Sequence, residues 1–497
     1  MVLGAVAASC LMPFHRAPQR VQPVQHVHSP MLACLLAFAL ALGVKPNKAS
    51  VDAVSVSLRK PFTARSALTR VPGTSLLDTP MFNASRRFAL LLVGLLLQSC
   101  GTSTNEIEKN TVLDVQAVHR NALTIDAHAD IEIPGQPSSY VGLDGLSKVA
   151  PDKMRAGGLD AVVMSIAVGP KPRTAEGYAE ARRIAEAELA AVVSLAADPA
   201  SGAVIATGPD ALHAANEAGQ LAFILGLQNA LIFGQDPAAI DEWFAAGVRV
   251  FALTHMGHND YADSSRPLFV AATGQREPDA EHGGLSDLGV AAIRRINELG
   301  GIVDISQLSR QAALQAIELS SAPVIASHSN VQALTAVSRN LSDEEIDRIG
   351  ATGGVIHVAP FRGYLFDSTN PELDQAIRDV RRAAGIDEDY LYPFELYWEI
   401  KDAEIKARFL ADVGALLGEI NLDRMLDHID YIAKRVGVDH VGIGTDFNHG
   451  SGIAGFVDAS DALNVTLGLL ARGYSESDIA KIWGGNFVRV WQQSDKQ

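Results

Sequence analysis

From residue 122 onward, short apolar runs alternate with longer stretches in which apolar residues recur at helical spacing. The short runs are rich in β-branched residues and apolar on both faces, which is typical of strands in a covered parallel sheet. They lie at 122–128, 160–167, 221–227, 249–255, 301–306, 323–328, 354–360 and 440–446. Segments such as 175–195, 286–299 and 459–471 have apolar residues three and four positions apart, and this spacing predicts helices between the strands.

The alternation of strands with helices predicts an α/β protein, and specifically a closed (β/α)8 barrel of the TIM type. Such a barrel needs about 250 residues plus insertions, which fits this chain of 497 residues. The alternative, an open doubly wound sheet, requires a glycine-rich turn after the first strand, and the "DAHADIEI" of residues 126–133 is not one. The largest expected insertion is a charged, mostly helical segment at 362–435, before the last strand.

The first hundred residues have a different pattern. Arg86 and Arg87 precede an apolar run at 88–97, which is too short to span a bilayer and has the layout of a signal peptide. The letters "LQSC" that end at Cys100 resemble a bacterial lipoprotein box; the alternative is an ordinary secretion signal with an incidental cysteine. "SRRFAL" also partly resembles a twin-arginine signal.

These features divide the chain into four expected parts. Residues 1–80 lie outside the mature protein, with Met81 as the start, and 81–100 form a lipoprotein-type signal peptide. Residues 101–120 form a short tether, and 121–497 form the barrel. We therefore expect an exported protein, periplasmic or at the cell surface, that is anchored to a membrane only through lipid on Cys100.

Charge and cysteine content narrow the expected partners. The formal net charge of −16 argues against a nucleic-acid partner, because phosphate binding needs clustered Lys and Arg. The cysteines are Cys10, Cys34 and Cys100, so the barrel itself offers no disulfide and no thiolate ligand. A homodimer is left open.

Polar side chains stand where the predicted strands end. In a barrel these positions share the carboxyl-terminal rim, where catalytic groups collect. A lone histidine on a strand is more often a structural residue, but histidines and aspartates from four strands that meet at one rim indicate a metal or acid–base site. The strand-end residues are His128, Asp130, Gln228, His255 with His258 and Asn259 just after it, Gln307, His328 and Asp446.

These residues lie in motifs that resemble the membrane (renal) dipeptidases, zinc metallopeptidases of the amidohydrolase-like barrel class. The resemblance runs from about residue 120 to 492. It is carried by "DAHAD", "MRAGGLDAVVMSIAV", "GVRVFALTHMGHND", "PVIASHSNVQALTAVSRNLSDEEI", "HVGIGTDF" and "GGNFVRVW".

The resemblance implies two zinc ions held by histidines and acids at the strand ends. The first zinc would be bound by His128 and Asp130, and the second by His328 together with a histidine that ends the fifth strand. That histidine is replaced by Gln307, and the glutamate that bridges both zincs is replaced by Gln228.

The resemblance also implies substrate-facing residues. His255 would polarise the scissile carbonyl, Arg339 would clamp the C-terminal carboxylate of a dipeptide, and Asp446 would relay protons and meet the substrate amino group. Tyr364 falls in the region of a substrate-facing tyrosine. The family's "DFDG" reads "DFNH" here, so Asn448 replaces a second carboxylate.

The two glutamines bear on the number of metal ions. Neutral amides are poor substitutes for a carboxylate and an imidazole on zinc. Two divalent cations roughly 3.5 Å apart repel by about 19 kcal/mol at an effective dielectric of about 20, and bridging anions must offset this. We therefore expect one zinc ion per chain, or none, rather than two. His128 and Asp130 would begin such a site, and His328, His255 or Asp446 would complete it.

Two functional hypotheses follow. The first is an exported metal-dependent hydrolase that cleaves dipeptides or similar small amides by metal-activated water. The second is a diverged relative with a degraded metal site, which acts as a binding or maturation factor for a small exported peptide product.

Overall fold

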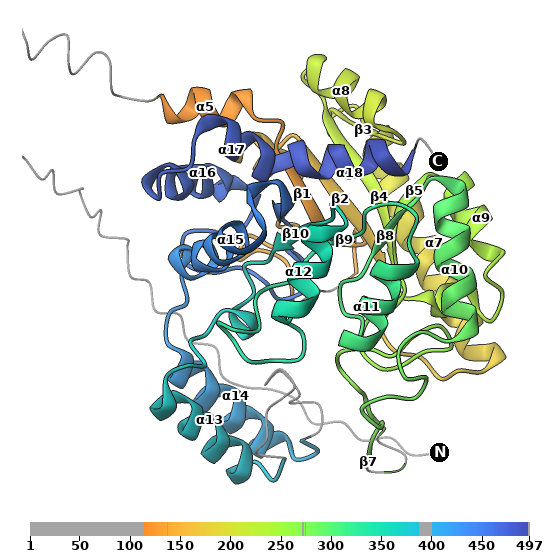
Figure 1. Ribbon diagram of the computed structural model, residues 1–497, viewed down its shortest axis with the longest axis vertical. Coiled ribbons are helices and arrows are strands. Elements are labelled where there is room, and N and C mark those ends of the chain that lie inside the picture. Colours follow the sequence, from red (N-terminus) through yellow and green to blue (C-terminus); the bar gives the residue numbers. More distant parts are fainter. Residues whose placement is uncertain (1–113, 137, 271–272, 274, 387–399, 496–497) are drawn as a thin grey trace, which may run out of the picture. The chain divides into compact units, whose positions relative to one another are not determined.

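The computed structural model describes residues 114–136, 138–270, 273, 275–386 and 400–495 (Figure 1). These residues belong to one compact unit that spans Cys100–Gln497. Among them, no helix has both the length and the apolar character that crossing a membrane requires. The predicted start, the signal peptide and Cys100 lie outside the described residues.

The core is a parallel sheet whose main path runs β1-β2-β4-β5-β8-β9-β10-β11. Each predicted strand run overlaps one of these strands. They are β1 (Ile125–Asp130), β2 (Ala161–Ala167), β4 (Leu221–Gln228), β5 (Val248–Ala252), β8 (Ile302–Asp304), β9 (Ile325–Ala326), β10 (Val355–Val358) and β11 (Val441–Ile443).

The first strand and the segment after the last strand close the sheet. Ala129 pairs in parallel with Phe447, and the Asp130 amide donates to the Phe447 carbonyl at 2.9 Å. The Asp446 amide donates to the His128 carbonyl at 2.8 Å. The predicted (β/α)8 barrel of the TIM type is therefore confirmed.

Helices connect the strands, as Figure 1 shows. Ser286, Ser309 and Ser342 cap the starts of α10, α11 and α12, because each serine hydroxyl accepts a backbone N–H of the first helical turn. The α-helices are α5 (Val115–Asn121), α6 (Pro151–Gly157), α7 (Ala175–Ala197), α8 (Pro209–Glu217), α9 (Ala239–Ala245), α10 (Asp287–Leu299), α11 (Arg310–Leu319), α12 (Asp343–Ala351), α13 (Pro371–Ala383), α14 (Ala403–Leu417), α15 (Leu422–Val436), α16 (Ala462–Ala471), α17 (Glu476–Ala480) and α18 (Asn486–Ser494). Short 3-10 turns lie at Ala230–Phe233, Arg362–Tyr364, Val438–His440 and Ala459–Asp461, and one π-helical turn at Lys481–Gly485.

Helix α18 packs against the sheet and joins a second core cluster. Phe487 and Trp491 pack edge to face, with ring centroids 6.0 Å apart. They belong to the same apolar cluster as residues from several strands, among them Ile125, Ile224 and Val355. Figure 1 shows α18 lying across the strands. The C-terminal helix therefore contributes directly to the barrel core.

Several boundaries differ from the sequence-based expectations. Strands β5, β8, β9 and β11 end before the predicted runs do, because the last residues of those runs turn away from the ladder to form the site. The strand β3 (Ala203–Ile205), which pairs with β4, and the hairpin of β6 (Phe269–Val270) and β7 (Gln275–Arg276) were not predicted.

Two of the expected segments also have different limits. Within the insertion expected at 362–435, α15 packs against α12, β10 and β11 as a regular barrel helix, whereas α13 and α14 pack against each other. The tether expected at 101–120 overlaps α5, which packs against α16 and α17. The folded part therefore begins before residue 121.

Trp491→Ala tests the contribution of α18. Trp491 is fully buried, and its truncation leaves a large cavity, so the free energy of unfolding should fall by about 3–5 kcal/mol. Urea unfolding followed by circular dichroism measures this change. Leu467→Ala on α16, where the side chain is 45% exposed, is the control and should change stability by no more than about 0.5 kcal/mol. Equal losses in both variants would contradict the role given to α18.

Candidate metal and substrate site

A β-bulge changes the direction of the side chains at the end of β1. Asp126 is in register with Val162, but Ala129 is in register with Met164, so β1 carries one extra residue at this point. Bulges of this kind often redirect side chains beside active sites. The two predicted ligands follow the shift, with His128 Nε2 3.3 Å from Asp130 Oδ1.

Buried Asp126 connects this bulge by hydrogen bonds to the segment that follows the last strand. Its carboxylate accepts hydrogen bonds from the Thr445 amide at 2.7 Å, the Thr445 hydroxyl at 2.6 Å and the His128 amide at 3.1 Å. Burial raises the pKa of Asp126 to about 6, although these hydrogen bonds act against the rise. Asp126 is therefore a structural carboxylate beneath the site.

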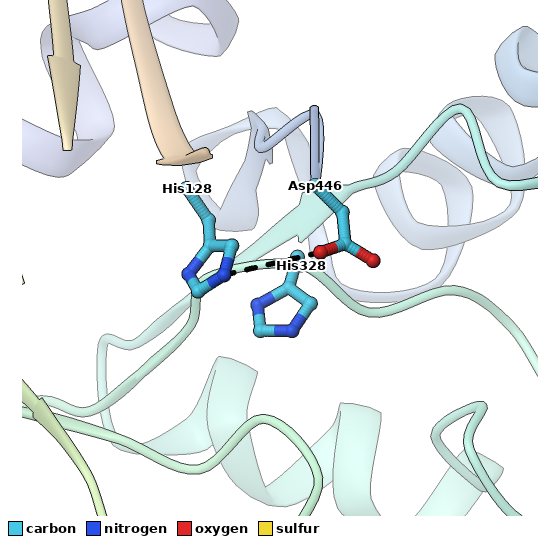
Figure 2. Close-up of side chains that lie close together, drawn as sticks. All are labelled: His128, His328 and Asp446. Atoms are coloured by element: carbon cyan, nitrogen blue, oxygen red, sulfur yellow. Dashed lines mark ion pairs between the residues drawn. The ribbon is translucent and has the colours of Figure 1, made fainter. Parts of the chain in front are cut away.

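Three of the predicted residues converge at the rim, as Figure 2 shows. His128, His328 and Asp446 each offer one ligand atom within 4.8 Å of the other two. The two imidazole rings stack at 3.8 Å, and His128 Nε2 lies 3.9 Å from Asp446 Oδ1. All three side chains are buried. The structure thus brings β1, the end of β9 and the end of β11 to one point.

The donor atoms on the β1 side fit a single metal ion. His128 Nε2 and Asp130 Oδ1 are buried and face each other at 3.3 Å, and neither atom has another hydrogen-bond partner among the described residues. Together with Asp446 they offer one imidazole and two carboxylates, a set that suits a catalytic zinc with an open coordination position. Burial raises the pKa of Asp446. Burial also disfavours charge on His128, but the hydrogen bond and charge of Asp130 raise its pKa.

The donor atoms on the His328 side do not fit a second metal ion. Ser327 Oγ donates its only hydrogen to Asp304 at 2.5 Å, so it accepts at 2.8 Å from His328 Nδ1, which therefore carries the imidazole proton. The remaining lone pair, on His328 Nε2, faces two amide nitrogens. Gln307 Nε2 lies at 3.2 Å and Gln228 Nε2 at 3.4 Å. Hydrogen bonds from the two glutamines occupy the atom that a metal would need.

Backbone strain is concentrated at this rim. Among the described residues, the non-glycine residues with positive φ are Asn229, Gln307, Asp446 and Asn448, at 90°, 68°, 54° and 64°. Each lies in or beside a strand-end position of the site. Such conformations persist only where surrounding contacts enforce them, and they cluster at functional sites.

Arg339 and Tyr364 lie on the His328 side. The buried Arg339 donates to Ser329 Oγ at 3.0 Å and to the His328 carbonyl at 2.6 Å. Its guanidinium carbon lies 5.3 Å from the Tyr364 ring centroid. Arg266, which sequence reasoning missed, donates to the Tyr364 hydroxyl at 3.3 Å and to Gln307 Oε1.

His255 and His449 line a cavity of about 280 Å³ beside Asp130. Neither ring nitrogen of the buried His255 has a hydrogen-bond partner. His449 Nδ1 lies 2.8 Å from Asp130 Oδ2, and its ring is 5.0 Å from that of His255. Sequence reasoning missed His449, although "DFNH" places it three residues after Asp446. Glu188 also lines the cavity, and burial raises its pKa to about 9.

The other polar residues near the strand ends have structural roles. His258 contacts the Pro278 carbonyl at 2.7 Å and accepts from the Ser264 amide at 3.0 Å. Asn259 donates to the Leu253 carbonyl at 2.6 Å. Asn448 donates to the Asp130 carbonyl and accepts from the Lys148 amide, both at 2.8 Å. These side chains stabilise the loops, and Asn448 also lines the cavity beside Asp130.

Comparisons with known proteins agree with this arrangement. The family model "Membrane dipeptidase (Peptidase family M19)" matches residues 113–497. Dipeptidase aclJ of Aspergillus oryzae is 31% identical over 273 residues, which cover 55% of this chain and 51% of that protein. Dipeptidase tcpJ of Claviceps purpurea is 28% identical, with 55% and 51% covered. The chain thus spans about half the length of the curated relatives it matches.

A solved structure covers more of the chain. The probable dipeptidase PvdM from Pseudomonas aeruginosa is 35% identical with a TM-score of 0.68, and the match covers 77% of this chain and 98% of that one. From the extent of these matches we conclude that this chain belongs to the membrane dipeptidase family.

Proposed function

We propose that the protein is a metal-dependent hydrolase that cleaves dipeptides or similar small amides with one zinc ion per chain. The observation that carries this proposal is the buried pair of donor atoms His128 Nε2 and Asp130 Oδ1, which lie 3.3 Å apart beside Asp446 and have no other hydrogen-bond partner in the described part of the chain. His128, Asp130 and Asp446 would hold the zinc. Bound there, zinc would supply a water of lowered pKa as the nucleophile.

His255 suits the role of a hydrogen-bond donor to the scissile carbonyl. Burial, together with the nearby charges of His449 and Arg266, holds the pKa of His255 well below its usual range. The neutral imidazole carries one N–H, and neither nitrogen is committed to a protein partner. An uncommitted donor in a buried site stabilises negative charge that develops on a substrate oxygen.

Asp446 and Arg339 suit the two ends of a dipeptide. Burial raises the pKa of Asp446 and so favours proton transfer to this carboxylate, which can also pair with a substrate amino group. Arg339 uses two of its five N–H groups on Ser329 and His328, and its Nε is unpaired. The remaining groups can hold a carboxylate by charge-assisted hydrogen bonds.

His449 suits the role of orienting Asp130. Burial alone would lower the pKa of His449, but the charge of Asp130 and the hydrogen bond to it raise that pKa to about 9. The charged imidazole therefore holds Asp130 Oδ2 at neutral pH, which leaves Oδ1 directed toward His128.

We further propose that the protein is exported and carries lipid on Cys100. Support comes from the sequence alone, through the paired arginines, the apolar run at 88–97 and "LQSC". A single lipid chain gives marginal membrane binding, so a firm anchor requires more than one.

A second function is favoured by one observation. The lone pair of His328 Nε2 is occupied by the amides of Gln228 and Gln307, as expected if metal chemistry has been lost in this half of the site. In that case the pocket would bind a small exported peptide product and act in its maturation without cleaving it.

Asp130→Asn and His255→Asn separate metal binding from catalysis. Asp130→Asn should reduce the zinc content and the dipeptidase activity together, because it removes a charged ligand. His255→Asn should keep the zinc but lower kcat by about 10²–10³, because it removes a donor to the developing charge. Metal analysis and dipeptide hydrolysis measure both effects. If the wild type with one zinc hydrolyses no dipeptide yet binds one through Arg339, the binding function replaces the hydrolase.

His449→Gln tests the pair with Asp130 in metal-free protein. Because the pKa of His449 is raised from 6.5 to about 9, the pair stabilises the fold fully below pH 6.5, and this stabilisation is lost as the pH rises through about 9. His449 is a quarter exposed, so solvent screens the pair and we expect about 1–2 kcal/mol. The free energy of unfolding of the wild type should therefore fall toward that of the variant between pH 6.5 and 9. A constant difference across this range would contradict the pairing.

Cys100→Ala tests the anchor. The wild type, expressed in a bacterium that processes lipoproteins, should fractionate with membranes, and the variant should be released into the soluble fraction. Western blotting of the fractions measures this. A variant that stays with the membranes, or a mature N-terminus within residues 1–80, would refute the lipoprotein assignment.

A further inference from the structure

Arg266 is a buried cation for which no described residue provides a carboxylate partner. The side chain is almost fully buried, and its hydrogen bonds go to the neutral groups Gln307 Oε1 and the Tyr364 hydroxyl. The Nε atom has no partner. An arginine stays charged in a protein, and a buried charge is stable only when an opposite charge or sufficient hydrogen bonds compensate it. An anionic ligand group would supply the opposite charge that the described residues do not provide at Arg266.

The loop around Arg266 is held in one position. The Arg266 amide donates to Ser264 Oγ at 3.1 Å, and that hydroxyl donates to the His255 carbonyl at 2.6 Å. The Arg266 carbonyl accepts from the Gly257 amide at 2.9 Å. The Arg266 backbone is thus held to the segment that carries His255, and the guanidinium is held by its bonds to Gln307 and Tyr364.

Arg266 also determines how Gln307 faces His328. A guanidinium only donates hydrogen bonds, so the Gln307 oxygen must face Arg266 and its NH2 group must face His328 Nε2, which lies 3.2 Å away. The neighbouring Gln228 is likewise neutral. This half of the site contains a fixed positive charge and no bridging carboxylate.

We propose that the Arg266 guanidinium replaces the second metal ion of the site: it excludes a metal from His328 and binds an anionic oxygen at the reacting group of the ligand. The ligand class is an acyl compound that becomes tetrahedral and negative, or a stable phosphinate with that shape. The ligand half of the inference rests on the proposed hydrolase function. The exclusion of a metal from His328 does not rest on that function, because metal binding can be measured without turnover.

The metal half is tested by restoring the missing ligands with and without Arg266. Gln228→Glu with Gln307→His supplies a carboxylate and an imidazole, but the double variant should still hold one zinc per chain after dialysis. Adding Arg266→Met should raise the zinc content to two. Inductively coupled plasma mass spectrometry of the purified protein measures both. Two zinc ions in the double variant, or no gain in the triple variant, would overturn the inference.

Two controls separate charge from a general loss of structure. Arg266→Lys, combined with Gln228→Glu and Gln307→His in place of Arg266→Met, keeps the positive charge and should leave the zinc content at one. Arg310→Met in the double variant with Gln228→Glu and Gln307→His removes an exposed arginine that pairs with Glu344. It should also leave the zinc content at one. The melting temperature of each variant shows whether it folds. A second zinc in either control would mean that the Arg266 charge is not what excludes the metal.

The ligand half is tested by calorimetry with a phosphinate mimic of a dipeptide and with the same mimic ending in a carboxamide. Arg266→Met should weaken the binding of both by about 10- to 150-fold, as expected for a lost charge-assisted hydrogen bond. Arg339→Met should weaken only the mimic that ends in a carboxylate. If Arg266→Met affects only that same mimic, Arg266 belongs to the carboxylate clamp and the inference is wrong. Unchanged affinity for both mimics would also overturn it.

These measurements distinguish the inference from the proposed function. Zinc content and equilibrium affinity do not depend on turnover, so a protein that hydrolyses no dipeptide can still show the predicted pattern. Conversely, an active protein whose double variant holds two zinc ions would keep the hydrolase function and lose the role given to Arg266.

Discussion

The site depends on the hydrogen bonds that join β1 to the segment after β11. Two backbone bonds link His128 and Asp130 to Asp446 and Phe447, and the Asp126 carboxylate holds Thr445 from below. These bonds close the barrel and also place Asp446 beside His128. Asp446 has a positive φ of 54°, so its position relies on these neighbours rather than on its own conformational preference. The same hydrogen bonds therefore determine both how stably the barrel closes and where the site residues lie.

The rim divides into two chemically different halves. On the β1 side, the imidazole of His128 and the carboxylates of Asp130 and Asp446 lie close together, a ligand set that suits a zinc ion with an open position. On the His328 side, the amides of Gln228 and Gln307 form hydrogen bonds with the imidazole, and the Arg266 guanidinium donates to Gln307. Neutral amides beside a fixed cation cannot offset the charge of a second divalent ion. These residues therefore fit one metal ion better than two.

Much of the fold and part of the site could be predicted from the sequence. Buried parallel strands produce continuous apolar runs, and the polar residues that end them must share a rim, which is why His128, His328 and Asp446 were found together. Arg266 could not be found in this way, because its place depends on contacts with Gln307 and Tyr364, which lie 41 and 98 positions away. The bulge in β1 could not be predicted either, because it is defined by the register between β1 and its partner strand β2.

The most direct test of a one-metal site is anomalous diffraction from crystals of the wild-type protein grown with excess zinc. Data recorded on both sides of the zinc absorption edge locate each ion independently of activity. We expect one strong peak among His128, Asp130 and Asp446, with His328 Nε2 still bonded to the amides of Gln228 and Gln307. A second peak of comparable height on His328 Nε2 would contradict it.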